Sequence, residues 1–341
     1  MPYPFTRRRF AATAAAVLAS PFIARSAAAA PIELRCSLDT APSHPRNVAY
    51  RDFLAKIEAA SDGQVKTQLF ESGALFPDLK VVTALVQGQV EMCCPGTWTL
   101  TGFVADADFS ELPAFYGRPL EAVRKAIDGR GGKFVNDEIS KKLRVETLGG
   151  WFDLGYYEWW STRKKLTSLA DLKGMKLRSP GGVLISWRIH YFGGLPNVTA
   201  WPDVPLAMSQ GTFDGLISSN ESVNSAKLYD SGMRYSLQDR QAIAFYVPMV
   251  NQAFWAKLGP KLQEKVLQIW AENLPTWREN TAKSQQHARD ELTTHNVSFV
   301  DVTQAELDAV FAQMVKEQDK AVADAHMTPE LAKMVLADVG A

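Results

Sequence analysis

Residues Leu166–Pro180, LTSLADLKGMKLRSP, contain the stretch around which we expect the fold to be organised. The pattern predicts a short helix capped by Ser168, a turn at Gly174 and a strand that ends at Arg178. Open α/β sheets bind ligands in the crevice at the carboxyl ends of their strands, so an arginine there can meet a ligand. Its guanidinium can bind a carboxylate through two parallel hydrogen bonds. The competing interpretation is a surface or ion-paired arginine.

Strand and helix patterns alternate on both sides of this stretch. The predicted order before it is strand 32–38, helix 47–61, strand 65–70, helix 78–87 and strand 90–94. After it we expect helices 183–192 and 203–210, a strand over 213–220, further strands near 242–251 and a long helix that reaches about Thr294. This alternation predicts an α/β fold with parallel sheets that helices cover.

The first thirty residues have the pattern of an export signal rather than of a folded element. A basic segment at residues 6–10 precedes an apolar run over residues 11–24 and the small residues Ala27–Ala30. This order predicts a signal peptide over residues 1–30, and the paired arginines fit the twin-arginine type, so we expect a periplasmic protein. The apolar run is short for a membrane span, and an uncleaved anchor is the alternative.

Charge and size narrow the classes of partner. Removal of residues 1–30 takes four arginines and no acid from the 37 basic and 37 acidic residues, which leaves 33 against 37 and a net charge of −4. We therefore expect no nucleic-acid partner and no binding to anionic lipid. The remaining chain, about 311 residues, is long enough for two lobes.

The chain lacks the sequence signatures of a nucleotide fold and of a metal enzyme. No glycine-rich phosphate loop follows the first predicted strand, and the five histidines form no HExxH pair, so we expect no cofactor and no metal. Cys36, Cys93 and Cys94 lack metal-site spacing. Export would permit a disulfide from Cys36 to Cys93 or Cys94, and buried free thiols are the other interpretation.

Two tryptophans at the ends of predicted strands are candidates for a pocket. Trp98 follows the strand over residues 90–94, and Trp151 follows a strand that begins at Val145; glycines lie beside both. Trp159 and Trp160 belong to an aromatic cluster that we expect to pack in the core. Because large rings dominate cores, packing is the alternative for Trp98 and Trp151 also.

Several motifs, in the same order along the chain, resemble one family. They are FESGALF (70–76), ELPAFY (111–116), LADLKGMKLRSP (169–180), Trp201, PLAMSQGTFDGL (205–216) and VNQAFWAKL (250–258). Together they resemble the solute-binding subunits of tripartite ATP-independent periplasmic (TRAP) transporters. The resemblance implies a periplasmic-binding-protein fold, with two α/β lobes around a central cleft, joined by crossing strands and a long helix. It places residues 31–154 and about 242–283 in lobe I, and about 155–241 and 284–341 in lobe II.

The resemblance also implies a site. In this family the arginine that ends the strand after DLKG pairs with the substrate carboxylate, which here is Arg178. An aromatic residue 23 positions later lines the pocket, which here is Trp201. In this family a polar residue, often asparagine, shortly after the DG pair contacts the ligand. Here the DG pair is Asp214 and Gly215, and the matching positions hold Ile217 and Ser218 instead of asparagine. The polar candidates in this region are therefore Ser218 and Asn220.

A further departure bears on the ligand. Glu158 stands twenty residues before Arg178, where sialic-acid-binding members carry a second arginine. A carboxylate there would repel a second anionic group or pair with Arg178, so we expect a monocarboxylate rather than sialic acid or a dicarboxylate. Rings at Trp98, Trp151 and Trp201 would suit a hydrophobic or aromatic acid.

The implied function is capture of a small organic acid and its delivery to TRAP membrane subunits, with no catalytic residues. One alternative is an exported α/β hydrolase, although no Gly-x-Ser-x-Gly elbow is present. Another is a binding protein that serves a sensor or an ABC system.

Overall fold

The computed structural model describes Met1 and residues 30–339. The predicted signal peptide therefore lies almost entirely outside the described residues. Within the described part, no helix has the length and apolar character needed to cross a membrane.

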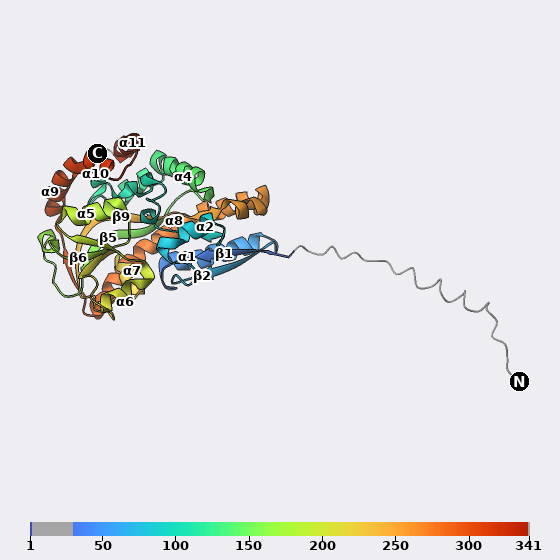
Figure 1. The fold of residues 1–341 in the computed structure, drawn as a ribbon, viewed down its shortest axis with the longest axis horizontal. Helices are drawn as coiled ribbons and strands as arrows, with labels where there is room; N and C mark the ends of the chain where they lie inside the picture. The colour runs from blue at the N-terminus through green and yellow to red at the C-terminus, as the bar shows by residue number, and fades with distance from the viewer. Residues whose placement is uncertain (2–29, 340–341) are drawn as a thin grey trace. The chain divides into compact units, whose positions relative to one another are not determined.

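Two sheets form the framework of residues 32–339 (Figure 1). The first has the order β2-β1-β3-β10-β4, and the second has the order β11-β9-β5-β8-β6-β7. The strands of the first sheet are β1 Ile32–Ser37, β2 Val65–Phe70, β3 Met92–Cys93, β4 Val145–Thr147 and β10 Met249–Asn251. Those of the second are β5 Phe152–Ser161, β6 Lys176–Ser179, β7 Leu195–Val198, β8 Gly215–Ser218, β9 Tyr235–Tyr246 and β11 Ser298–Asp301. The predicted α/β fold is confirmed, but the expectation of parallel sheets was wrong. Both sheets are mixed, because β10 is antiparallel to β3 and β4, and β5 is antiparallel to β8 and β9.

Helices cover both sheets (Figure 1). The α-helices are α1 Pro45–Ala60, α2 Asp78–Val86, α3 Leu120–Ile127, α4 Arg130–Leu143, α5 Val183–Tyr191, α6 Val204–Ser209, α7 Asn220–Ser225, α8 Gln252–Thr294, α9 Gln304–Met314, α10 Gln318–Asp324 and α11 Pro329–Val339. Short 3₁₀ turns include η1 Thr97–Thr99, η2 Ala105–Glu111, η4 Leu169–Leu172 and η5 Trp201–Asp203. The helix predicted beside Ser168 is thus the single turn η4, closed by a capping box between Ser168 and Asp171.

The strand predicted over residues 213–220 is shorter than expected. β8 ends at Ser218, and Ser219 caps α7 by accepting the backbone N–H of Ser222. A serine before a polar run favours a helix start over a continued strand, because its hydroxyl satisfies one of the first free N–H groups. Asn220 therefore lies on a helix instead of at a strand end.

Two strands and one helix connect the sheets. β5 pairs with β9 in antiparallel register along most of its length; β4 precedes β5 in the chain, and β9 leads into β10. α8 packs on α1 beside the first sheet and on α7 and β5 beside the second, as the long orange helix of Figure 1 shows. The assignment of each residue to a lobe stays a prediction.

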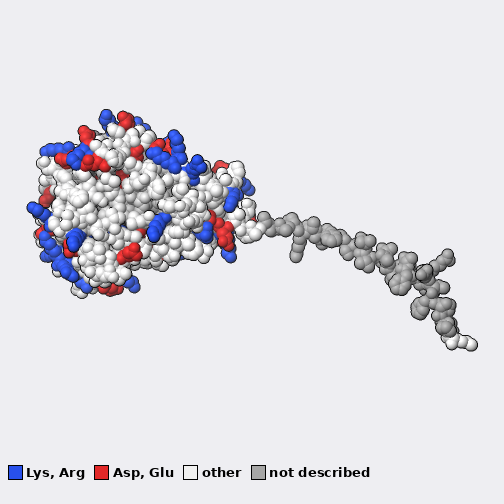
Figure 2. All heavy atoms as spheres, viewed as in Figure 1, with Lys and Arg blue, Asp and Glu red and all other residues white. Residues whose placement is uncertain are grey.

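Charged side chains of both signs are mixed over the face shown in Figure 2, and much of that face is uncharged. The three cysteines Cys36, Cys93 and Cys94 are buried and free in this structure.

Candidate functional site

Arg178 lies in a small buried cavity between elements of the two sheets. The cavity has a volume of about 20 Å³. Its lining residues are Asp39, Thr40, Asp78, Trp98, Leu154, Tyr157, Arg178, Pro180, Trp201, Ser218, Ser222 and Tyr246. Asp39 and Asp78 come from the segments after β1 and β2, whereas Arg178 and Ser218 come from β6 and β8, so both sheets contribute.

The guanidinium of Arg178 is buried and only partly bonded. Its Nε donates to the carbonyl oxygen of Thr199 at 2.9 Å. Nη2 has no hydrogen-bond partner within the described part of the chain, and it lies 3.9 Å from Oδ2 of Asp78. The guanidinium carbon lies 5.2 Å from the centre of the Trp201 ring, within the range of a cation–π contact. Arg178 is therefore held in place through Nε, and its buried Nη2 is still available to a ligand.

Two other buried donors lining this cavity also lack partners among residues 30–339: Nε1 of Trp98 and the hydroxyl of Tyr157. Both rings pack together at 5.8 Å between centres, and the ring of Trp98 also meets Tyr246 at 5.6 Å. Buried polar groups are nearly always hydrogen-bonded, so unpartnered donors around one cavity indicate a binding partner. The arrangement suits an anion with several acceptor atoms.

Acidic groups balance the charge of the cavity. Arg46 donates to Oδ1 of Asp39 at 2.6 Å, and both side chains are buried. Asp78 accepts the backbone N–H of Trp201 at 3.1 Å from the opposite side. Burial, and then the nearby Asp39, raises the pKa of Asp78 to about 7, while Arg178 acts in the opposite direction. Burial also lowers the pKa of Arg178.

The two sides of the cavity approach each other closely. Besides the bond from Trp201 to Asp78, a Cβ added at Gly73 would lie 2.6 Å from Cγ of Pro202. Gly73 also has φ +70°, a conformation that favours glycine. The FESGALF motif thus places backbone directly against the segment that carries Trp201.

His44 and Ser222 lie beside the cavity but do not form a base and nucleophile. Nδ1 of His44 accepts the backbone N–H of Arg46, and Nε2 lies 3.2 Å from Oγ of Ser222. In the neutral ring the proton is then on Nε2, which donates to Ser222 and cannot take its proton. Burial lowers the pKa of His44 well below its usual value, which favours that neutral form.

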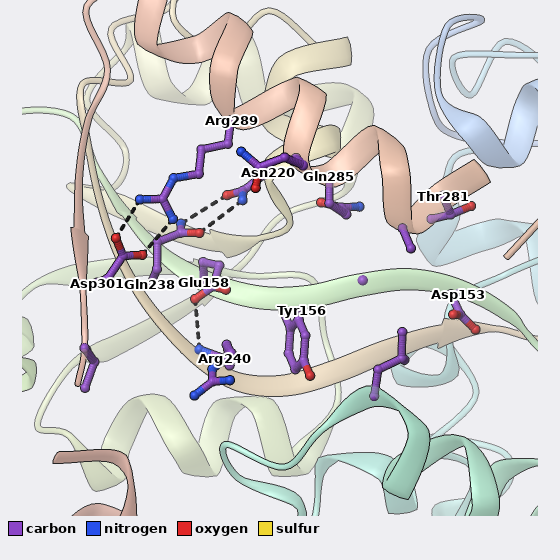
Figure 3. Close-up of a pocket in the computed structure, with 15 residues that line it drawn as sticks. Asp153, Tyr156, Glu158, Asn220, Gln238, Arg240, Thr281, Gln285, Arg289 and Asp301 are labelled. Atoms are coloured by element: carbon purple, nitrogen blue, oxygen red, sulfur yellow. Dashed lines mark hydrogen bonds and ion pairs between the residues drawn. The ribbon is translucent and has the colours of Figure 1, made fainter. Parts of the chain in front are cut away.

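Glu158 and Asn220 line a second, larger cavity of about 460 Å³ (Figure 3). Oε2 of Glu158 accepts the backbone N–H groups of Asp239 and Arg240 at 2.7 and 3.0 Å. Asn220 and Gln238 exchange two amide hydrogen bonds of 3.0 Å. Arg289 forms an ion pair with Asp301. Arg289 thus already has an acidic partner, and the guanidinium of Arg240 donates to the amide oxygen of Gln304 at 2.8 Å. The buried Nη2 of Arg178, which has no partner in the described chain, is therefore the better anchor for an anion.

The structure therefore divides the predicted site residues. It brings Arg178, Trp201, Trp98 and Ser218 to one cavity. Glu158 and Asn220 lie at the other. Glu158 therefore does not pair with Arg178, and it is not placed to repel a second anionic group of a ligand bound at Arg178.

Trp151 lies in neither cavity. It is fully buried beside Phe109 and Phe245, and its Nε1 donates to Oδ1 of Asn136 at 2.8 Å. The alternative of core packing describes its position in the structure.

Sequence reasoning missed Asp39, Asp78, Tyr157 and Tyr246. Asp39 comes shortly after the end of β1, and the rule for strand ends could have found it. Asp78 begins α2, well after the end of β2, and that rule does not single it out. Tyr157 stands close to Trp159 and Trp160 in a stretch rich in aromatic residues, where rings are expected to pack in the core. Tyr157 and Glu158 are adjacent in β5, and they line different cavities.

Trp98 and Trp151 provide a matched test of whether the cavity at Arg178 binds the ligand. We expect Trp98→Phe to weaken binding of an anionic ligand about 5- to 30-fold, because it removes a buried donor worth about 1–2 kcal/mol. Trp151→Phe should leave the affinity unchanged. Calorimetry of both variants measures this difference, and equal losses would remove Trp98 from the site.

The fold and the cavity define the class of this chain: an α/β protein of two sheets with a buried cavity between them. A family model described as bacterial extracellular solute-binding protein, family 7 (DctP), matches residues 37–324. The chain therefore belongs to this family, the solute-binding proteins of TRAP transporters, which are binding proteins and not enzymes.

Relatives and solved structures agree with this membership. The C4-dicarboxylate-binding periplasmic protein DctP of Rhodobacter capsulatus is 25% identical over 272 residues, which cover 79% of each chain. The uncharacterized protein y4mM of Sinorhizobium fredii is 27% identical over 271 residues; the match covers 77% of this chain and 48% of that protein, about half its length.

The sugar acid binding protein DctPAm from Advenella mimigardefordensis, solved with galactonate, superposes with a TM-score of 0.85 at 19% identity, covering 91% of this chain and 98% of that one. A TRAP periplasmic solute-binding protein from Ralstonia eutropha, solved with (S)-2-acetolactate, gives a TM-score of 0.82 at 23% identity, covering 90% and 98%.

Proposed function

We propose that this protein captures a small organic acid by its carboxylate and delivers it to the membrane subunits of a TRAP transporter. The observation that carries the proposal is Nη2 of Arg178, a buried donor that has no partner among residues 30–339 and lies at a cavity between two sheets. A carboxylate there would accept from this guanidinium, and Trp98 and Tyr157 offer further donors. Charge-assisted bonds of this kind strengthen where water is excluded.

The lining of the cavity supports a monocarboxylate. Among the described residues that line it, Arg178 is the single lysine or arginine, and Asp39 and Asp78 are acids. A second carboxylate on the ligand would meet these acids without a second free cation. The rings of Trp98, Tyr157, Trp201 and Tyr246 are compatible with an apolar or aromatic remainder.

Names of related proteins support an acid as ligand. A neighbour of known structure was solved with galactonate, another with succinate, and a relative is described as binding C4-dicarboxylates. The ligands differ among these proteins but are all organic acids. They therefore support an organic acid as the ligand class and do not indicate which acid this chain binds. Delivery to membrane subunits, a periplasmic location and export by a twin-arginine signal complete the proposal. Genes for two membrane subunits beside this one would support the partner.

A thermal-shift screen against small carboxylates tests the proposal. A ligand at 100 times its Kd adds about 2.7 kcal/mol to stability, so we expect a saturable rise in Tm with at least one acid. Incubation followed by mass spectrometry should return that acid unchanged. Turnover of the acid would favour the hydrolase alternative, and a screen in which only uncharged solutes bind would contradict the proposal.

A further inference from the structure

We infer that the acid bound at Arg178 carries a hydrogen-bond donor, a hydroxyl or an ammonium group, on the carbon next to its carboxylate, and that Asp78 accepts from this donor. The inference rests on the proposed function, because it takes the carboxylate on Arg178 as given. It narrows the ligand to 2-hydroxy and 2-amino acids and makes Asp78 a residue that determines specificity.

The first observation is a distance. Oδ2 of Asp78 lies 3.9 Å from Nη2 of Arg178, which is too long for a hydrogen bond, and Nη2 is unpartnered across the described ranges. A carboxylate oxygen that bonds to Nη2 therefore comes to lie close to the carboxylate of Asp78. Two adjacent carboxylates repel each other unless a proton lies between them. A donor on the neighbouring carbon supplies that proton.

The second observation is the charge already present. Arg46 and Asp39 form a buried pair behind the cavity, and Arg178 faces Asp78 across it. The formal charges of these four groups cancel. A simple carboxylate would add an uncompensated negative charge to a buried site, which is costly. An ammonium beside the carboxylate avoids this charge, and a hydroxyl lets Asp78 accept a hydrogen bond instead of facing a bare anion.

Asp78 is better placed to accept than Asp39. Oδ1 of Asp39 accepts from the guanidinium of Arg46 at 2.6 Å, so Asp39 already has a cationic partner in contact. Within the described part of the chain, Asp78 accepts from the backbone N–H groups of Trp201 and Leu79, and it is the acid that lies 3.9 Å from Nη2 of Arg178. Asp78 also stands in the first turn of α2, where the helix dipole favours an ionised carboxylate. Its carboxylate can therefore take a further donor from the ligand.

Three matched sets of acids test the inference on the mature chain by calorimetry. The sets are acetate, glycolate and glycine; propionate, lactate and alanine; and 3-phenylpropionate, 3-phenyllactate and phenylalanine. At pH 8, above the pKa of about 7 of Asp78, its carboxylate is mainly ionised. We expect the hydroxy or amino acid of at least one set to bind about 100-fold or more tightly than the acid without the donor. A site that bonds a substrate hydroxyl or amine strongly rejects analogues that lack it.

Asp78→Asn tests whether the carboxylate of Asp78, rather than the rest of the cavity, causes the tighter binding of the hydroxy or amino acid. The variant keeps the size and one acceptor oxygen but loses the charge, so the advantage of the donor-bearing acid should fall to about 10-fold or less. Asp301→Asn is the matched control, because Asp301 pairs with Arg289 at the other cavity. It should leave the advantage unchanged. Circular dichroism confirms that both variants are folded.

Equal binding of the matched acids by the wild-type protein would overturn the inference while leaving the proposed function intact. That result would mean that a protonated Asp78 donates to the ligand carboxylate. Failure of all nine acids to bind would also overturn the inference, and the broad carboxylate screen would then decide the proposed function separately. An unchanged advantage in Asp78→Asn would remove Asp78 from the role.

Discussion

Replacement of Arg178 by glutamine is expected to weaken binding of the cognate acid several hundred-fold while the protein stays folded. The substitution leaves a ligand carboxylate in a closed site without its cation, a loss of about 3–5 kcal/mol. The fold should survive because the guanidinium makes one internal hydrogen bond, to Thr199, and its burial already disfavours the charge. Calorimetry with an acid found in the thermal-shift screen measures the affinity, and circular dichroism checks the fold.

Arg289→Gln is the matched control for this experiment. Arg289 is also an arginine in a cavity, but it lies on α8 and pairs with Asp301 at the larger cavity of Figure 3. We expect it to bind the acid as the wild-type protein does. Loss of binding in Arg289→Gln with normal binding in Arg178→Gln would move the site to the second cavity and contradict the proposed function.

Arg188→Met is expected to lower the free energy of unfolding by about 3–5 kcal/mol, the range measured when one partner of a buried ion pair is removed. Arg188 lies on α5, and its Nη1 donates to Oε2 of Glu111 at 2.7 Å. Its Nη2 donates to the carbonyl oxygen of Glu111 at 2.6 Å. Both side chains are buried, at 1% and 0% exposure. Denaturant unfolding of the purified variant measures the loss.

The double variant Arg188→Met with Glu111→Gln shows whether the loss of stability comes from leaving the buried carboxylate of Glu111 without its cationic partner. We expect it to recover part of the stability, because a neutral amide costs less to bury than an unpaired charge. Burial already raises the pKa of Glu111. Without Arg188 the folded state should favour the protonated acid still more, so the deficit of the single variant should shrink as the pH falls towards the ordinary glutamate range. A deficit that is independent of pH would argue against this explanation.

The sequence patterns predicted the sheets and the central arginine because both depend on local signals. Gly174 and Pro180 bracket the strand that carries Arg178, and the alternation of strands and helices extends through most of the chain. The short η4 turn and the early end of β8 differ from the predictions because capping by Ser168 and Ser219 fixed their boundaries. Such boundaries depend on one side chain more than on periodicity.

The site was predicted less completely, because its residues come from distant segments. Asp78, Tyr157 and Arg178 meet only after two sheets form and face each other, and no spacing along the chain records that contact. Glu158 was matched to the site through the family resemblance, and in the structure it lines the cavity of Figure 3, whereas its neighbour Tyr157 lines the cavity at Arg178. Trp151 satisfies the same local pattern as Trp98, and its bond to Asn136 distinguishes the two only in three dimensions.

The close approach of Pro202 to Gly73, together with the bond from Trp201 to Asp78, has a kinetic consequence. A cavity of about 20 Å³ holds about one water molecule, so a solute enclosed there can leave only after these contacts separate. The dissociation rate of the ligand is then limited by the rate at which the protein opens. Two acids that bind with different affinities can therefore dissociate at the same rate. Handover to a membrane partner would accordingly be accelerated by any surface that pulls these two segments apart.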